Sequence, residues 1–173
     1  MATSNRTQAF KIRTPLQPAF ALEWIVASGS VQSIAAGDPV TLADATGAAT
    51  GAVKIAGDGD PIVGSGHRFA GIAKSDSTDT ATVAGIVQVW LPLPGIIYSG
   101  KAKTSSTADT QAEINALQGK RVVLDLTSTT WSVDAAATDA ITNGIVIVGG
   151  NPPTTEIYFM VMPSITFLGN AVA

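Results

Sequence analysis

Apolar residues alternate with other residues along short stretches of this chain, a pattern typical of half-buried β-strands. The strongest example runs from Val83 to Leu91. It stops at Pro92, because proline cannot donate a hydrogen bond to a strand ladder. Similar stretches, separated by turns rich in Gly, Pro and Asn, predict further strands at 20–26, 40–42, 53–55, 69–73, 121–127, 131–133, 145–148 and 156–162.

Two of these predicted strands carry apolar residues on both faces. Residues 145–148 form a continuous apolar run, so we expect this strand to be buried on both sides. In the last predicted strand neither face is polar, so it is expected to lie between two layers or to face a partner subunit. Tyr158, Met160 and Met162 share one face of that strand and are candidate residues of a subunit interface.

One short helix is predicted after Thr110. Thr110 and Glu113 have the spacing of a capping box, in which two side chains satisfy the amides at the helix start. Ile114 and Leu117 then share a face, and Gly119 follows where a left-handed residue ends a helix. A parallel α/β fold would need several long helices. The pattern therefore predicts an all-β fold, an antiparallel β-barrel or sandwich with one short α-helix and an extended N-terminal arm.

Charge is unevenly distributed along the chain. The 173 residues carry a formal net charge of −3, yet the first 22 contain three cations and no acid: Arg6, Lys11 and Arg13. Two prolines disfavour a helix there. We expect an extended basic arm over 1–18, with a frayed terminus as the alternative, and a single β-rich domain over 19–173.

Composition removes several classes of function. The chain has no cysteine and one histidine, so thiolate chemistry and sites that need two imidazoles are excluded. An acidic balance argues against general binding to nucleic acid. The apolar runs are much shorter than the roughly 20 residues that a membrane-spanning helix needs. We expect no cofactor, no nucleic acid, no membrane and no catalytic residues.

A few residues still invite chemical hypotheses. His67, with Ser65 nearby, could belong to a Ser-His-Asp triad, but no nucleophile elbow surrounds them, and an exposed loop histidine is the simpler interpretation. Exposed tryptophans could bind sugar, although buried tryptophan is commoner in strands; the candidates are Trp24, Trp90 and Trp131. Aspartates in loops could bind Ca²⁺, although turn-forming aspartate that bonds its own backbone is the alternative; these are Asp58, Asp60, Asp76 and Asp79.

Repetition inside the chain is limited to one tripeptide. Gly-Asp-Pro occurs at 37–39 and again at 59–61, each time before an apolar residue. Two copies predict a reused turn that leads into a strand, because a solenoid needs three or more repeats.

Taken in order, these signals resemble head decoration (cement) proteins of tailed bacteriophages. The resemblance covers most of residues 20–168 and includes the basic arm that precedes them. It is carried by the stretches Gly-Asp-Pro-Val at 37–40, Phe-Ala-Gly-Ile-Ala at 69–73, and the apolar stretches at 82–89, 119–124 and 144–152. The chain is longer than many such proteins.

The resemblance implies a small β-rich protein on the outer surface of the virion, often trimeric, that binds the major capsid protein and has no catalytic residues. The arm would then contact neighbouring capsid subunits through Arg6, Phe10, Lys11 and Arg13. Bridging would stabilise the shell, because a trimer multiplies modest contacts through effective concentration. Two alternatives stay open: a carbohydrate-binding or adhesive β module, and an enzyme that uses His67.

Overall fold

The computed structural model describes residues 10–15, 19–27, 33–43, 51–61, 68–80 and 83–166. It is mostly β, with one α-helix in the described residues. The elements are β1 (Lys11–Pro15), β2 (Ala21–Val26), β3 (Pro39–Leu42), β4 (Ala52–Ile55), β5 (Phe69–Ala73), β6 (Ile86–Trp90), β7 (Ile96–Lys101), α1 (Gln111–Leu117), β8 (Arg121–Val122), β9 (Leu124–Thr127), β10 (Thr130–Val133), β11 (Ile145–Asn151) and β12 (Glu156–Val161), with 3₁₀ turns at Ser105–Thr107, Pro152–Thr154 and Pro163–Ile165.

Strands β2 to β6 close into a small barrel in the order β2-β4-β3-β5-β6. All neighbouring pairs are antiparallel except β2 and β4, which pair in parallel over two residues. Valines fill the barrel because their branched side chains pack well on a pleated surface. The barrel core includes Val26, Val40, Val53, Val87 and Val89. An all-β barrel is therefore the architecture of this half of the chain.

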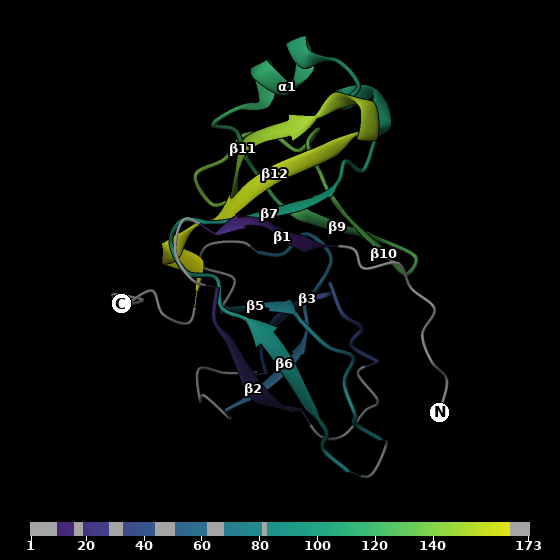
Figure 1. The fold of residues 1–173 in the computed structure, drawn as a ribbon, viewed down its shortest axis with the longest axis vertical. Coiled ribbons are helices and arrows are strands. Elements are labelled where there is room, and N and C mark those ends of the chain that lie inside the picture. Colours follow the sequence, from purple (N-terminus) through teal and green to yellow (C-terminus); the bar gives the residue numbers. More distant parts are fainter. Residues whose placement is uncertain are drawn as a thin grey trace.

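Strand β1, near the start of the chain, joins four later strands in an antiparallel five-stranded sheet of order β1-β7-β12-β11-β8. Figure 1 shows this sheet above the barrel, with α1 at the far end and the β9–β10 hairpin behind it. The inner face of the sheet contributes Tyr98 and Phe159, whose rings stack at 5.7 Å, to a large core. That core also takes Ile114 from α1 and Trp131 from the hairpin.

Strand β5 belongs to both cores. Phe69 and Ile72 pack into the core beneath the five-stranded sheet, whereas Ala70 and Ala73 pack inside the barrel. Between them, Gly71 has a φ of +144°, and a Cβ there would collide with the backbone oxygen of Trp90. The strand is therefore buried on both faces and forms a common wall between barrel and sheet.

The two Gly-Asp-Pro turns use the same hydrogen bonds, which confirms a reused turn; the first leads into β3, and the residues that directly follow the second lie outside the described ranges. Asp38 Oδ2 accepts from Ala35 N at 2.9 Å, and Asp60 Oδ2 accepts from Gly57 N at 2.8 Å. Each turn also makes two backbone hydrogen bonds to one distant residue. The glycine N–H of the turn donates to the backbone oxygen of that residue, and the backbone oxygen of the aspartate accepts from its N–H. The first turn clamps Ala73 at the end of β5. The second clamps Leu124 at the start of β9.

Several local predictions can be compared directly with the structure. The capping box of Thr110 and Glu113 is present, and Gly119 has a φ of +84°, as expected. The turn between β9 and β10 is also confirmed. The prediction for 145–148 was wrong, because Val146 and Val148 are only half-buried. They lie on the outer face of the sheet, and α1 covers only the inner one.

Candidate interaction surface

The basic segment enters the fold as strand β1, which pairs antiparallel with β7 at one edge of the five-stranded sheet. The side chains of Lys11 and Arg13 are exposed. The Arg13 guanidinium lies 5.0 Å from the centre of the Tyr158 ring, a cation–π contact that holds this cation against the sheet. Arg6 falls outside the described residues. Two of the predicted cations are therefore placed on a rigid strand.

Phe10 does not lie on the surface with them. It is fully buried, against the expectation that it contacts a capsid. Its ring packs edge-on against Phe159, with the ring centres 5.5 Å apart, and it occupies the space left by the missing side chain of Gly100. Burial of this phenyl ring stabilises the fold because it removes apolar surface from water. Phe10 therefore anchors β1 to the sheet.

The predicted interface residues divide between two environments. Tyr158 and Met160 are half-buried and lie on the outer face of β12, opposite the core residues Ile157 and Phe159. Met162 follows β12, and its side chain packs against the core. Tyr158 and Met160 therefore remain candidates for contact with another molecule.

The barrel presents a second apolar surface that the sequence analysis did not identify. Ile25 of β2 and Ile86 of β6 face each other in the ladder, and both are about half exposed, at 57% and 49%. Phe20, Leu22 and Val83 are exposed to a similar degree. Strand periodicity could not have distinguished them from core residues, because an outward and an inward isoleucine have the same hydropathy.

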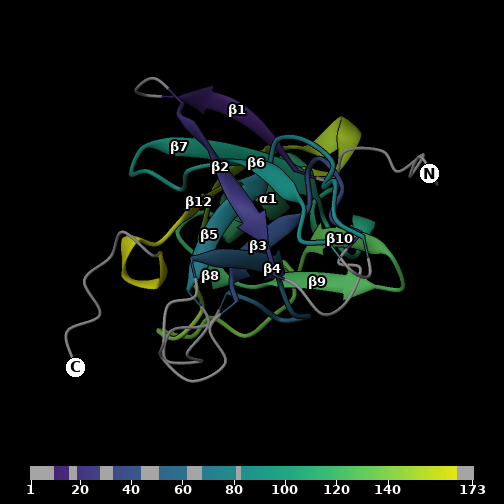
Figure 2. The ribbon, with the colours of Figure 1, turned by 90° about the horizontal axis from the view of Figure 1, so that it is seen from below.

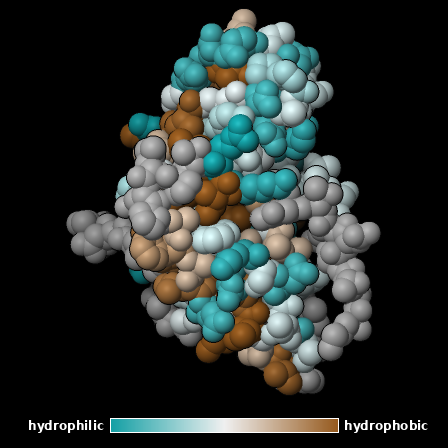
Figure 3. Space-filling view, viewed as in Figure 1, coloured by the Kyte–Doolittle hydropathy of each residue, from teal (hydrophilic) through white to brown (hydrophobic). Residues whose placement is uncertain are grey.

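Both surfaces lie on the same side of the molecule. In Figure 1, β2 and β6 face the viewer below β12 and β7. Figure 3 shows brown, hydrophobic areas on this side over the barrel as well as over the sheet, with hydrophilic areas between them. We call this side the apolar face and define it by Tyr158 and Met160 on β12, Ile25 on β2, and Ile86 on β6.

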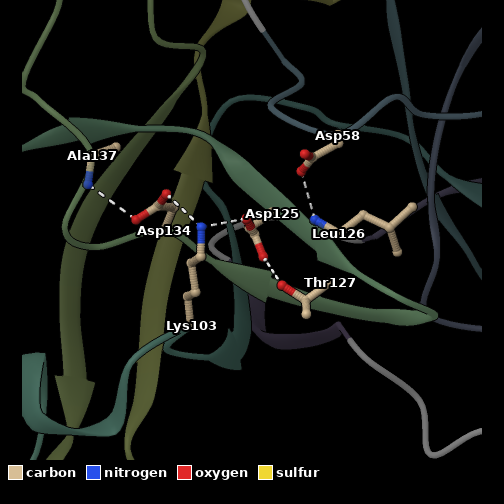
Figure 4. Close-up of polar contacts among 7 residues, drawn as sticks. All are labelled: Asp58, Lys103, Asp125, Leu126, Thr127, Asp134 and Ala137. Atoms are coloured by element: carbon tan, nitrogen blue, oxygen red, sulfur yellow. Dashed lines mark hydrogen bonds and ion pairs between the residues drawn. The ribbon is translucent and has the colours of Figure 1, made fainter.

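A polar cluster ties the β9–β10 hairpin to the end of β7. Lys103 Nζ lies 2.6 Å from Asp125 Oδ1 and 3.4 Å from Asp134 Oδ2, as Figure 4 shows. Thr127 Oγ1 donates to the second oxygen of Asp125 at 2.7 Å. Asp134 also accepts from Ala137 N at 3.1 Å.

Proton affinity in this cluster follows from these contacts. Burial alone would raise the pKa of Asp125, but hydrogen bonds from Lys103 and Thr127 favour the ionised carboxylate and hold that pKa below its ordinary value. The hydrogen bond to Asp125 raises the pKa of Lys103. Lys103, Asp125 and Thr127 satisfy one another's charges and hydrogen-bonding groups, so the cluster is best explained as a structural contact between the hairpin and the end of β7.

The aspartates considered as Ca²⁺ ligands bond to the protein itself. Asp58 Oδ1 accepts from Leu126 N at 2.8 Å, and Asp60 accepts within its own turn. Asp76 Oδ1 accepts from Ala36 N, and Asp79 Oδ1 accepts from Ser77 Oγ. Within the described ranges, no group of three or more His, Cys, Asp or Glu residues is arranged to hold a metal ion.

The remaining chemical candidates are not assembled into a site. His67 and Ser65 lie outside the described residues. Trp131 is buried in the core, and Trp24 packs against the barrel core. Trp90 is half-buried, and the Lys74 ammonium lies 4.9 Å from its ring centre, where a sugar would otherwise stack. The described part of the chain contains no helix long and apolar enough to cross a membrane.

Comparisons of the chain with protein-family models, with curated proteins and with solved structures find no match. The fold class and the apolar face are therefore the observations from which a function can be argued.

Proposed function

We propose that this protein is a capsid decoration protein that binds the outer surface of a phage head and stabilises the shell by bridging subunits of the major capsid protein. The observation that carries the proposal is the apolar face: Ile25 and Ile86 are about half exposed on the barrel, and half-buried Tyr158 and Met160 lie on the outer face of β12. Exposed apolar areas rimmed by polar residues commonly mark a site of interaction with another protein.

The surroundings of this face favour a protein partner. Lys11 and Arg13 lie on β1 at the edge of the same sheet, and Glu23 and Gln88 lie beside Ile25 and Ile86 in the β2–β6 ladder. An apolar centre with a polar rim is the usual composition of a protein–protein interface. Such a surface can cover a partner without any catalytic group.

Shell stabilisation follows from repeated binding. A ligand that binds the assembled shell and not the dissociated subunits shifts the equilibrium towards the shell by mass action. In a homotrimer, binding of one subunit to the shell raises the local concentration of the other two subunits there. Three contacts that are individually weak therefore give strong binding together.

The proposal is tested with expanded heads of the phage that encodes this chain. Purified protein is mixed with heads that lack it, and bound protein is measured by sedimentation. We expect saturable binding, a higher temperature of head disruption and a trimer by light scattering. Absence of binding to expanded heads at micromolar protein would refute the function.

The apolar face can be tested by a matched pair of variants. Ile25→Ser combined with Ile86→Ser should weaken head binding, because it removes apolar area from the proposed contact. Ile141→Ser is the control, since Ile141 is 80% exposed in the loop between β10 and β11 and is not part of this face. Equal loss in both variants would contradict the assignment of the face.

A further inference from the structure

The two edges of the five-stranded sheet differ in whether their backbone groups are already bonded. The β8 edge is short, and a neighbouring loop covers it: Asp139 Oδ1 accepts from Arg121 N at 3.1 Å, and Asn143 Nδ2 donates to Arg121 O at 2.9 Å. These two bonds occupy the outward N–H and C=O of Arg121. This edge is closed to another strand.

The β1 edge is open. Strand β1 has five residues and pairs with β7 alone. Phe10 N donates to Gly37 O just before the strand. Beyond that bond, no hydrogen bond from the described residues reaches the outer edge of β1. Figure 2 shows β1 as the outermost strand, with no element on its far side. Such an edge is a template for pairing with another chain.

This edge is also held in place before any partner arrives. Phe10 is anchored above Gly100 and Phe159 at one end of β1, and Arg13 lies over Tyr158. An extended strand that is already fixed loses little conformational entropy when a second strand adds to it. The edge is therefore suited to binding by strand addition.

Charge selects the kind of strand that fits. Lys11 and Arg13 are both exposed on β1. A second copy of β1 would place cations near cations, and like charges on paired strands repel. Acidic side chains on the incoming strand would instead pair with Lys11, because the Arg13 guanidinium lies over Tyr158 on β12, on the other side of β1 from this edge. A second copy of this chain is thus disfavoured at this edge.

We propose that the β1 edge binds an extended acidic segment of the partner protein, which adds to the five-stranded sheet as a sixth strand. The inference rests on the proposed function for the identity of that partner, the major capsid protein. Main-chain hydrogen bonds would provide affinity, and Lys11 would provide specificity.

Hydrogen exchange tests strand addition. Amide exchange of residues 11–14 is measured by mass spectrometry on the full chain, free and bound to heads. We expect slower exchange there in the bound protein, because outward N–H groups gain partners. Protein that binds heads while exchange at 11–14 stays unchanged would overturn strand addition and leave the proposed function standing.

Charge reversal tests the specificity. Lys11→Glu combined with Arg13→Glu should weaken head binding by about tenfold, because it removes the ion pair to Lys11 and the cation–π contact that holds β1 against β12. Lys54→Glu on the barrel strand β4 is the matched control. Equal binding by the double variant and the control would refute the choice of an acidic strand.

A synthetic peptide separates this edge from the proposed function. A labelled peptide of alternating valine and glutamate should perturb the amide signals of residues 11–14 in nuclear magnetic resonance spectra, whereas a valine–lysine peptide should not. Perturbation by the acidic peptide without head binding would support the edge and refute the capsid function. Equal perturbation by both peptides, or by neither, would refute the charge selection.

Discussion

The contact between Phe10 and Gly100 predicts the effect of a smaller residue at position 10 and of a larger residue at position 100. Phe10 is fully buried, and its truncation to alanine should cost about 3–5 kcal/mol, the usual range for a buried phenylalanine. A Cβ at Gly100 would fall well inside contact distance of Phe10 Cδ1 and Cε1. Gly100→Ala should therefore cost about 1–3 kcal/mol through overpacking.

The combination of both substitutions should be less harmful than the sum. Once the Phe10 ring is absent, the nearest remaining atom to the methyl group introduced by Gly100→Ala is Val133 Cγ2, at an ordinary contact distance of 3.6 Å. Alanine is also favoured over glycine in a strand by about 0.5–1 kcal/mol. We expect a coupling free energy of at least about 1 kcal/mol in the double-mutant cycle.

The assay is equilibrium unfolding in urea, followed by the fluorescence of the three tryptophans, for the wild type, both single variants and the double variant. Amide exchange at residues 11–14 shows in parallel whether β1 detaches before the rest unfolds. Strictly additive costs, or a Gly100→Ala variant as stable as the wild type, would refute the anchoring role of Phe10.

Three further predictions concern stability. Gly71→Ala should lower the free energy of unfolding, measured by chemical denaturation, by at least about 3 kcal/mol, because the new Cβ would meet Trp90 O. Gly119→Ala has open space and should lower it only by the left-handed strain of about 1–2 kcal/mol. Similar losses in the two variants would contradict this. Thr110→Ala should lower the free energy of unfolding by about 1 kcal/mol through loss of the cap. Thr129, which is exposed in the turn between β9 and β10, provides the control, and Thr129→Ala should cost less. Asp125→Asn should destabilise at neutral pH. Since the folded state holds the pKa of Asp125 below its unfolded value of about 3.9, that contribution is present above pH 4 and is lost as pH falls further; a constant difference down to pH 2 would refute it.

Local sequence signals predicted local structure well. The capping box, the left-handed Gly119 and the repeated Gly-Asp-Pro turns depend on hydrogen bonds within a few residues. Period-two alternation likewise located most strands, and the strand before Pro92 ends at Trp90.

Strand β7 was missed although it lies between β1 and β12 in the sheet. Its sequence, Ile96 to Lys101, places two isoleucines side by side, and a serine and a glycine follow Tyr98, so no alternation is visible. Gly100 is there to admit the ring of Phe10, and that ring comes from a segment about ninety residues earlier in the chain. A requirement set by so distant a partner leaves no periodic signal.

The barrel part of the apolar face, Ile25 and Ile86, was beyond prediction for a related reason. Alternation shows that Ile25 and Ile86 belong to strands, but not which side of a strand the rest of the protein covers. Likewise, the basic segment suggested binding by Phe10 together with Lys11 and Arg13, whereas tertiary packing turned Phe10 inward. Exposure is decided by the whole fold.

The common wall formed by β5 has a consequence for how the molecule comes apart. Loss of the barrel would strip Phe69 and Ile72 from beneath the sheet, and loss of the sheet would uncover the same strand from above. Neither half can melt while leaving its neighbour intact. Heating should therefore give a single calorimetric peak, with the barrel and the sheet denaturing as one cooperative unit.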